Sequence, residues 1–256
     1  MNKTDLNFSS ILFIDSGIGG LTTLVETLKI INTNVIYFAD NKFAPYGTKS
    51  ETFLKNRLTQ IINRITKQYN ISTVVLACNT ATTSSIAYLR NKFNNICFIG
   101  TEPAYKTAIN LTFKNPLLIA TPQTINQLSS KNIPIHLVPK HSLASTIESN
   151  HIEKNPISNY NILKEIYILC KQIKKHDCLI LGCTHYIFIK DKLSKIIKIP
   201  IIDGNQGVAK QISKNYCHES LKFSTVKIIL SNKKCGSLQK YKKILKQILA
   251  NSVSMW

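Results

Sequence analysis

The sequence predicts an α/β fold with a largely parallel sheet, and two observations lead to this prediction. Short apolar runs alternate with longer segments of helical period along most of the chain. Two of these runs, TVVLAC ending at Cys78 and CLILGC ending at Cys183, are each followed by small hydroxyl and amide residues suited to opening a helix. The length of 256 residues allows one large domain or two of ordinary size.

The apolar runs predict the strands in order along the chain. They cover residues 11–14, 35–39, 73–77, 96–99, 117–120, 135–138, 178–181, 199–202 and 226–230. Between the second and third runs, five apolar residues repeat at helical spacing, which predicts a helix packed on a sheet: Leu54, Leu58, Ile61, Ile62 and Ile65. The polar stretch 148–161 and the turn 100–103 are the predicted places for chain crossings or domain boundaries.

Composition favours a cytoplasmic protein with reduced thiols. No run approaches the roughly 18 apolar residues of a spanning helix, and the first residues lack the apolar core of a secretory signal. The cysteines are seven, an odd number, without CxxC spacing, in a chain too long to need disulfides. Neither they nor the six histidines form ligand-like pairs, and Cys217-His218 is isolated, so we expect no metal site.

The net charge of +20 raises the possibility of a nucleic-acid or anionic membrane partner. Only Arg57, Arg64 and Arg90 are arginine, so 33 minus 3 leaves 30 lysines. Lysine is the poorer residue for bidentate recognition of bases or phosphates, and much of it is scattered along helical stretches. A solvated surface is the simpler interpretation, and we expect neither a nucleic-acid nor a membrane partner.

Cys78 and Cys183 differ from the other cysteines because each comes at the end of a strand and before a predicted helix. Ligands of open α/β sheets bind beyond the carboxyl ends of strands. A helix N-terminus stabilises a thiolate, and a free thiol, with a pKa of about 8.5, needs only a modest downward shift to act as a base. One thiolate and one thiol on opposite faces of a carbon could invert a stereocentre. We interpret Cys97, Cys170, Cys178, Cys217 and Cys235 as structural.

The first predicted strand ends in FIDSGIGGLT, where Asp15 and Ser16 stand at the strand tip. The glycines allow the backbone to turn sharply and approach a ligand. The segment is a poor phosphate loop, because it has no Gly-Lys-Ser/Thr and no final fingerprint glycine. Asp15 could assist Cys78, and His185, two residues after Cys183, could hold or relay a proton there.

The loop DNKFAPYGTKS after the second predicted strand allows two interpretations. One is a turn followed by a helix capped by Thr48 or Ser50. The other is a rigid turn that presents backbone N–H groups and Tyr46 to a carboxylate. Spacing alone leaves both open.

Six blocks together resemble glutamate racemase, of the cofactor-independent amino-acid racemase superfamily. They occur in the family's order over nearly the whole chain: DSGIGG (15–20), PYG (45–47), ACNTAT (77–82), EPA (102–104), IES (147–149) and GCTHY (182–186). The resemblance implies two flavodoxin-like α/β lobes with mostly parallel sheets and the active site between them. The first lobe would comprise residues 1–95 and 210–256, and the second residues 96–209.

The resemblance also assigns the site. Cys78 and Cys183 become the acid/base residues, with Asp15 beside the first and with Glu148 and His185 supporting the second. The implied substrate contacts are Asp15, Ser16, Pro45, Tyr46, Gly47, Cys78, Asn79, Thr80, Thr124, Cys183, Thr184 and His185. Two positions depart from the family pattern: Gln123 replaces a usual glycine before Thr124, and Ile187 follows CTHY where proline is usual.

The function implied by the resemblance is racemisation of glutamate by two thiols, without a cofactor. One thiolate removes the Cα proton and the opposing thiol returns a proton to the other face. The product, D-glutamate, would supply peptidoglycan synthesis, and a homodimer is expected by resemblance only. Two alternatives remain: a racemase of another small acidic amino acid such as aspartate, and a non-catalytic, basic relative that binds DNA or protein.

Overall fold

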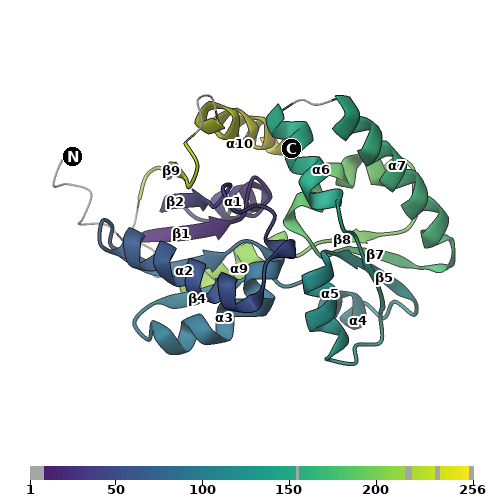
Figure 1. Cartoon of the computed structure of the whole chain (residues 1–256), viewed down its shortest axis with the longest axis horizontal. Helices are drawn as coiled ribbons and strands as arrows, with labels where there is room; N and C mark the ends of the chain where they lie inside the picture. Colours follow the sequence, from purple (N-terminus) through teal and green to yellow (C-terminus); the bar gives the residue numbers. More distant parts are fainter. Residues whose placement is uncertain (1–8, 154–155, 217–220, 234–236, 254–256) are drawn as a thin grey trace.

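The computed structural model describes residues 9–153, 156–216, 221–233 and 237–253. Two all-parallel β-sheets form its framework, each with helices on both faces. Figure 1 shows the two sheets with their helices as two halves of the molecule, placed side by side. The predicted fold class is confirmed.

The first sheet has five strands in the order β4-β3-β1-β2-β9, and every neighbouring pair is parallel. The strands are β1 (Ser10–Asp15), β2 (Asn34–Ala39), β3 (Ile71–Leu76), β4 (Cys97–Gly100) and β9 (Thr225–Leu230). Alternate residues of β1 point to opposite faces, because Ile11 and Phe13 belong to one core cluster and Leu12 and Ile14 to another. Helices must therefore cover both faces.

One face of the first sheet packs on α1 (Gly20–Leu28), α9 (Asn205–Asn215) and α10 (Ser237–Val253). The other packs on α2 (Glu51–Thr66) and α3 (Asn79–Lys92), with the short helix η2 (Tyr46–Thr48) before α2. All five residues of the predicted helical stripe lie on α2 and are buried. The 3.6-residue period of that stripe arises because one side of α2 faces the sheet.

The second sheet has four strands in the order β6-β5-β7-β8, again all parallel. They are β5 (Pro116–Ala120), β6 (His136–Pro139), β7 (Cys178–Leu181) and β8 (Ile201–Ile202). One face packs on α4 (Tyr105–Asn110) and α5 (Pro122–Ser129). The other packs on α6 (Leu143–Glu153), α7 (Pro156–Gln172), η3 (Ile173–Lys175), η4 (Thr184–Ile189) and α8 (Lys190–Ser194).

The chain passes between the sheets at places that differ in part from the predicted ones. The turn at residues 100–103 does separate β4 from α4, as predicted. The polar stretch 148–161 is no crossing, because α6 and α7 occupy it and pack against each other on the second sheet. Among its residues with described burial, Asn159 and Tyr160 are exposed to solvent.

One predicted lobe boundary would separate β4 from the first sheet, and the other falls inside α9. β4 pairs with β3, although a boundary at residue 96 would put it in the second lobe. α9 starts at Asn205, ahead of the predicted return at residue 210, and contacts α1. The Asn205 side chain hydrogen-bonds Thr22 and Thr23 of α1. The division into two lobes stays a prediction, and the sheets favour crossings at residues 101–104 and 203–204.

Two further findings concern the surface and the ends of the chain. None of the helices in the described residues is both long and apolar enough to cross a membrane.

After β9, helix α10 runs across the top of the view in Figure 1 towards α6 of the other half. Cys217, His218 and Cys235 lie outside the described residues.

Candidate active site

The loops that follow the strands of the two sheets meet each other closely. A Cβ atom on Gly17 would clash with the Glu148 carboxylate, and one on Gly19 would clash with the Thr184 hydroxyl. The DSGIGG loop of the first sheet therefore needs glycine at these positions to approach the second sheet. This contact brings the strand-end residues of both sheets into one buried region.

Cys78 follows β3 and stands at the N-terminus of α3. Its sulfur faces the backbone N–H groups of Thr80 and Ala81, yet burial and the neighbouring Asp15 carboxylate raise its pKa. The expected downward shift at the helix N-terminus is therefore wrong for Cys78, because desolvation outweighs the helix contribution. In the free protein this side chain is held as a thiol.

Asp15 ends β1, the strand next to β3, and its side chain is completely buried. Its Oδ2 accepts hydrogen bonds from the backbone N–H groups of Gly17 at 3.2 Å and Gly20 at 3.0 Å. Burial raises the pKa of Asp15, although the His185 charge and these two donors oppose the shift. Its Oδ1 is buried without a hydrogen-bond partner among the described residues. A buried acceptor of this kind can receive a ligand donor.

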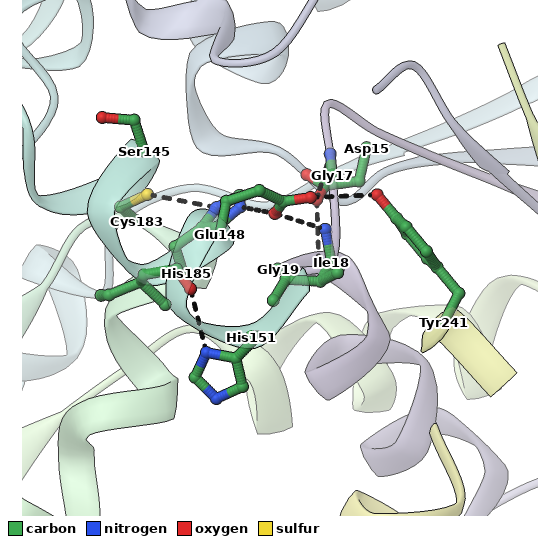
Figure 2. A network of polar contacts seen from close by, with 12 residues as sticks. Asp15, Gly17, Ile18, Gly19, Ser145, Glu148, His151, Cys183, His185 and Tyr241 are labelled. Carbon is green, nitrogen blue, oxygen red and sulfur yellow. Dashed lines mark hydrogen bonds and ion pairs between the residues drawn. The ribbon is translucent and has the colours of Figure 1, made fainter. Parts of the chain in front are cut away.

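Cys183 follows β7 and stands at the start of η4. His185 lies on the same short helix, with its Nδ1 4.0 Å from the Cys183 sulfur. The other ring nitrogen, Nε2, lies 2.7 Å from Glu148 Oε2 (Figure 2). Burial alone would lower the pKa of His185, but the bonds to Cys183 and Glu148 and their charges raise it well above its usual value. The imidazole is therefore held protonated, with its positive charge beside the Cys183 sulfur.

Glu148 lies on α6 and is held by groups from both halves of the molecule. Its Oε2 also accepts from the Ile18 backbone N–H at 2.9 Å, and its Oε1 accepts from the Tyr241 hydroxyl at 3.0 Å. Burial tends to raise the pKa of Glu148, but His185 and the two donors lower it below its ordinary value. Glu148 and His185 therefore form a buried ion pair.

Sequence reasoning missed Tyr241, which lies on α10 and is 1% exposed. Tyr241, Ile244 and Leu245 repeat at the spacing of a core-facing helix stripe, so the pattern indicates packing alone. The position of its hydroxyl depends on how α10 meets α6, which no local pattern encodes.

Three threonine hydroxyls from the two sheets gather in a second polar cluster. Thr80 of α3 lies 3.0 Å from Thr121 and 3.3 Å from Thr124, oxygen to oxygen, and the latter two are 3.1 Å apart. All three residues are buried. The cluster joins the helix that starts at Cys78 to the end of β5, which is the strand beside β7. Such hydroxyls can turn their O–H groups towards an anion.

The other predicted polar contacts lie around the same region. The Asn79 side-chain amide donates to the Thr101 carbonyl at 2.9 Å. The Thr184 hydroxyl is buried and has no partner among the described residues. Ser16 is 3% exposed and follows Asp15 directly. These residues lie where the predictions placed them, at the ends of β1, β3 and β7.

The loop at residues 45–47 is fixed by contacts to its own half. The Tyr46 hydroxyl donates to Asp40 at 2.8 Å, and Arg57 makes two hydrogen bonds to the same carboxylate at 2.6 and 2.8 Å. The phenol therefore has a structural partner. A cis peptide precedes Pro45, and a Cβ on Gly47 would meet Thr121 at 2.8 Å.

The remaining predictions concern the N-cap of α2 and the two positions that differ from the family pattern. Ser50 caps α2 by accepting from Phe53 N–H, so the capping interpretation of this loop is confirmed with Ser50 as the cap. Gln123 is partly exposed on α5 and leaves Thr124 buried and bonded. Ile187 packs at the edge of the second sheet's core.

The geometry thus presents two cysteines at helix N-termini, one from each sheet. They are near enough that a charge on Cys183 raises the pKa of Cys78. Both are 7% exposed, so a reaction between them would be shielded from water. In the described part of the chain, no three His, Cys, Asp or Glu side chains are grouped as metal ligands.

No family model matches the chain. Among curated proteins, it is 38% identical over 222 residues to the glutamate racemase of Clostridium novyi, covering 82% of this chain and 84% of the relative. It is 37% identical over 254 residues to the glutamate racemase of Buchnera aphidicola subsp. Schizaphis graminum, covering 93% of each.

Solved structures agree with the fold. The Escherichia coli glutamate racemase, in complex with L-glutamate and the activator UDP-MurNAc-Ala, has a TM-score of 0.78 at 24% identity, covering 94% of this chain and 95% of that one. The Francisella tularensis glutamate racemase, in complex with D-glutamate, has a TM-score of 0.73 at 25% identity, covering 96% and 95%.

Proposed function

The chain belongs to the glutamate racemase family, and we propose that it interconverts L- and D-glutamate with Cys78 and Cys183 as its two acid/base residues. The observation that carries the proposal is the pair of buried cysteines at helix N-termini, one from each sheet, in different electrostatic surroundings. Inversion of a stereocentre requires proton removal and proton return on opposite faces. Two thiols on opposite sides of a substrate can do both.

In the proposed reaction, a thiolate takes the proton from Cα, and the electron pair of that C–H bond remains on the substrate. The opposing thiol then gives its proton to the other face of Cα and becomes a thiolate. The two cysteines exchange protonation states, and the reverse reaction restores them. In one direction of the reaction Cys183, with the His185 imidazole beside it, takes the role of the base and Cys78 that of the acid.

The Cα–H bond of an amino acid is a very weak acid, so the site must stabilise the developing charge. Asn79, Thr184 and Ser16 lie at the strand ends and are suited to donate hydrogen bonds to the α-carboxylate. The Asp15 Oδ1, buried and without a partner in the described residues, is suited to accept from the substrate ammonium. These assignments give the substrate a fixed orientation between the thiols.

The threonine cluster is suited to the second carboxylate of the substrate. Thr80, Thr121 and Thr124 hydrogen-bond one another in the structure, and each hydroxyl would have to turn its single O–H out of this network to donate to a bound anion. Gly47 approaches Thr121 closely, so the turn at residues 45–47 lies next to this cluster. This pocket would select acidic amino acids over neutral ones.

The proposal is tested by incubating the purified protein, without added cofactor, with L-glutamate in D2O. Proton NMR follows exchange at Cα, and chiral chromatography follows formation of D-glutamate. Exchange together with D-glutamate formation supports the proposal, and L-aspartate in a parallel sample tests substrate choice. A folded, reduced protein that exchanges neither substrate would contradict it. Salt-sensitive DNA binding without turnover would instead support the binding-protein alternative.

The family's role leads us to propose that the product supplies cytoplasmic peptidoglycan synthesis. We also propose that the protein is a homodimer, which light scattering coupled to size-exclusion chromatography would test. A single peak with the mass of one chain, 28.9 kDa, would contradict the dimer.

A further inference from the structure

Tyr241 connects the last helix of the structure to the groups around Cys183. Its ring packs in the core of the first sheet with Ile244 and Leu245, whereas its hydroxyl reaches Glu148 on the second sheet's α6. In Figure 2 Glu148 lies between His185 on one side and the Tyr241 hydroxyl on the other. The chain of contacts runs from Tyr241 through Glu148 and His185 to the Cys183 sulfur.

The direction of these hydrogen bonds is fixed by charge. The Glu148 carboxylate can only accept, so the Tyr241 hydroxyl and the Ile18 N–H must donate to it. Burial and the neighbouring Glu148 raise the pKa of Tyr241, which keeps the phenol protonated and therefore a donor. Both donors belong to the first half of the molecule, and the acceptor belongs to the second.

The arrangement restrains both oxygens of Glu148. Oε2 is held between His185 Nε2 and the Ile18 N–H, and Oε1 is held by Tyr241. A carboxylate held only at Oε2 could rotate about its last side-chain bond, because that torsion is broad. With the Tyr241 bond in place, the oxygen that faces His185 has a fixed position. A buried tyrosine ring is a rigid support for such a bond, since the surrounding core fixes its rotamer.

We infer that Tyr241 is a positioning residue for racemisation: it orients Glu148, which holds the His185 imidazole beside Cys183. This inference rests on the proposed function. It predicts that removing one oxygen atom, far along the chain from both cysteines, slows proton transfer and leaves substrate binding nearly unchanged. Tyr241 does not touch either thiol and acts only through Glu148.

The test compares Tyr241→Phe with Tyr216→Phe. Tyr216 is buried in the same core cluster, and its hydroxyl also makes a hydrogen bond, to the Ser9 carbonyl at 3.0 Å, so it is a matched control away from the site. For Tyr241→Phe we expect kcat to fall about tenfold while KM stays within about twofold. For Tyr216→Phe we expect both constants to stay within about twofold of the wild-type values.

A second readout follows the imidazole itself and needs no turnover. In protein labelled with 15N-histidine, the His185 Nε2–H proton, bonded to Glu148 at 2.7 Å, should give a low-field resonance protected from exchange with water. We expect this resonance to shift and exchange faster in Tyr241→Phe and to stay unchanged in Tyr216→Phe. A purely structural loss would lower the melting temperature without this specific change.

Support requires both the lower kcat and the altered His185 resonance. A wild-type kcat in Tyr241→Phe would overturn the inference, and so would a lower kcat with an unchanged resonance, because the effect would not pass through Glu148. If the wild-type protein does not racemise glutamate, the proposed function fails instead. The resonance would then still show whether Tyr241 orients Glu148 and His185.

Discussion

The two cysteines have opposite surroundings, although both end a strand and begin a helix. Beside Cys78 stands the carboxyl group of Asp15, which together with burial raises the pKa of the thiol. Beside Cys183 stands the imidazole of His185, backed by the Glu148 carboxylate. Similar backbone positions thus have opposite charges beside the sulfur: a carboxylate beside Cys78 and an imidazolium beside Cys183.

Replacing either cysteine should have the largest effect. We expect Cys78→Ser and Cys183→Ser each to lower racemisation at least about a thousandfold, because a serine hydroxyl is too weak an acid and base for this step. Chiral chromatography measures the rate, and circular dichroism checks the fold. Full racemisation by either variant would show that the two sides are not both needed.

Removing the imidazole should act directly on the Cys183 side. We expect His185→Asn to lower kcat about a hundredfold, because the cation beside Cys183 is lost. His151→Asn is the matched control: His151 lies on α6 near Glu148, but burial lowers its pKa, so it carries no charge at neutral pH. Measured by steady-state kinetics, kcat of this control should stay within about twofold of the wild-type value. Equal losses in the two variants would argue against a specific role for the His185 charge.

The threonine cluster lies between the two sides and should affect binding more than chemistry. We expect Thr124→Val to raise KM for glutamate about tenfold, the cost of one lost hydrogen bond to a charged group, with little change in kcat. Thr66→Val, which removes a hydroxyl bonded to the Ile62 carbonyl on α2, is the control. An unchanged KM in Thr124→Val would place the substrate carboxylate elsewhere.

The two buried carboxyl groups should show the smallest effects, and of opposite sign, in thermal stability. The folded state raises the pKa of Asp15, so its ionised form opposes folding above the ordinary carboxyl pKa. The folded state lowers the pKa of Glu148, so its ionised form favours folding there. At pH 7 we expect Asp15→Asn to raise the melting temperature by about 3 °C and Glu148→Gln to lower it by about 3 °C, shifts that correspond to about 1 kcal/mol.

Calorimetry at several pH values sharpens this comparison. Both differences should shrink as the pH falls: the Asp15 penalty disappears below its ordinary pKa, and the Glu148 contribution is lost as the pH falls through its lowered folded value. Changes of the same sign in both variants would mean that the two carboxyl groups are not held in different environments.

Local patterns in the sequence predicted much of the fold. Each of the nine predicted strands overlaps one in the structure, and residues 178–181 match β7 in full. Short apolar runs with polar residues after them are sufficient for this, because strand ends carry their signal within a few residues. The apolar runs do not show which of the two sheets a strand joins. β4 pairs with β3 rather than with strands of the second sheet, and this depends on long-range packing.

The candidate site was also predictable only in part: the sequence predicted which residues lie at strand ends, but not the contacts between distant segments. Asp15, Cys78 and Cys183 lie at strand ends, so their motifs could be recognised locally. The raised pKa of Cys78 was not predictable, since it depends on burial and on the approach of Asp15. Tyr241 was missed because its chemistry comes from the meeting of α10 and α6, and an amphipathic stripe conveys only packing.

The position of Tyr241 along the chain has a consequence for biosynthesis. On the ribosome, Asp15, both cysteines, Glu148 and His185 all emerge before β9 completes the edge of the first sheet and before α10 can dock. A nascent chain that has reached residue 220 already carries both thiols, both carboxyl groups and the imidazole, but the tyrosine that donates to Glu148 Oε1 is still to be translated. Full activity would therefore arise late in synthesis, once the last helix has packed, so that an interrupted chain would be a poor catalyst.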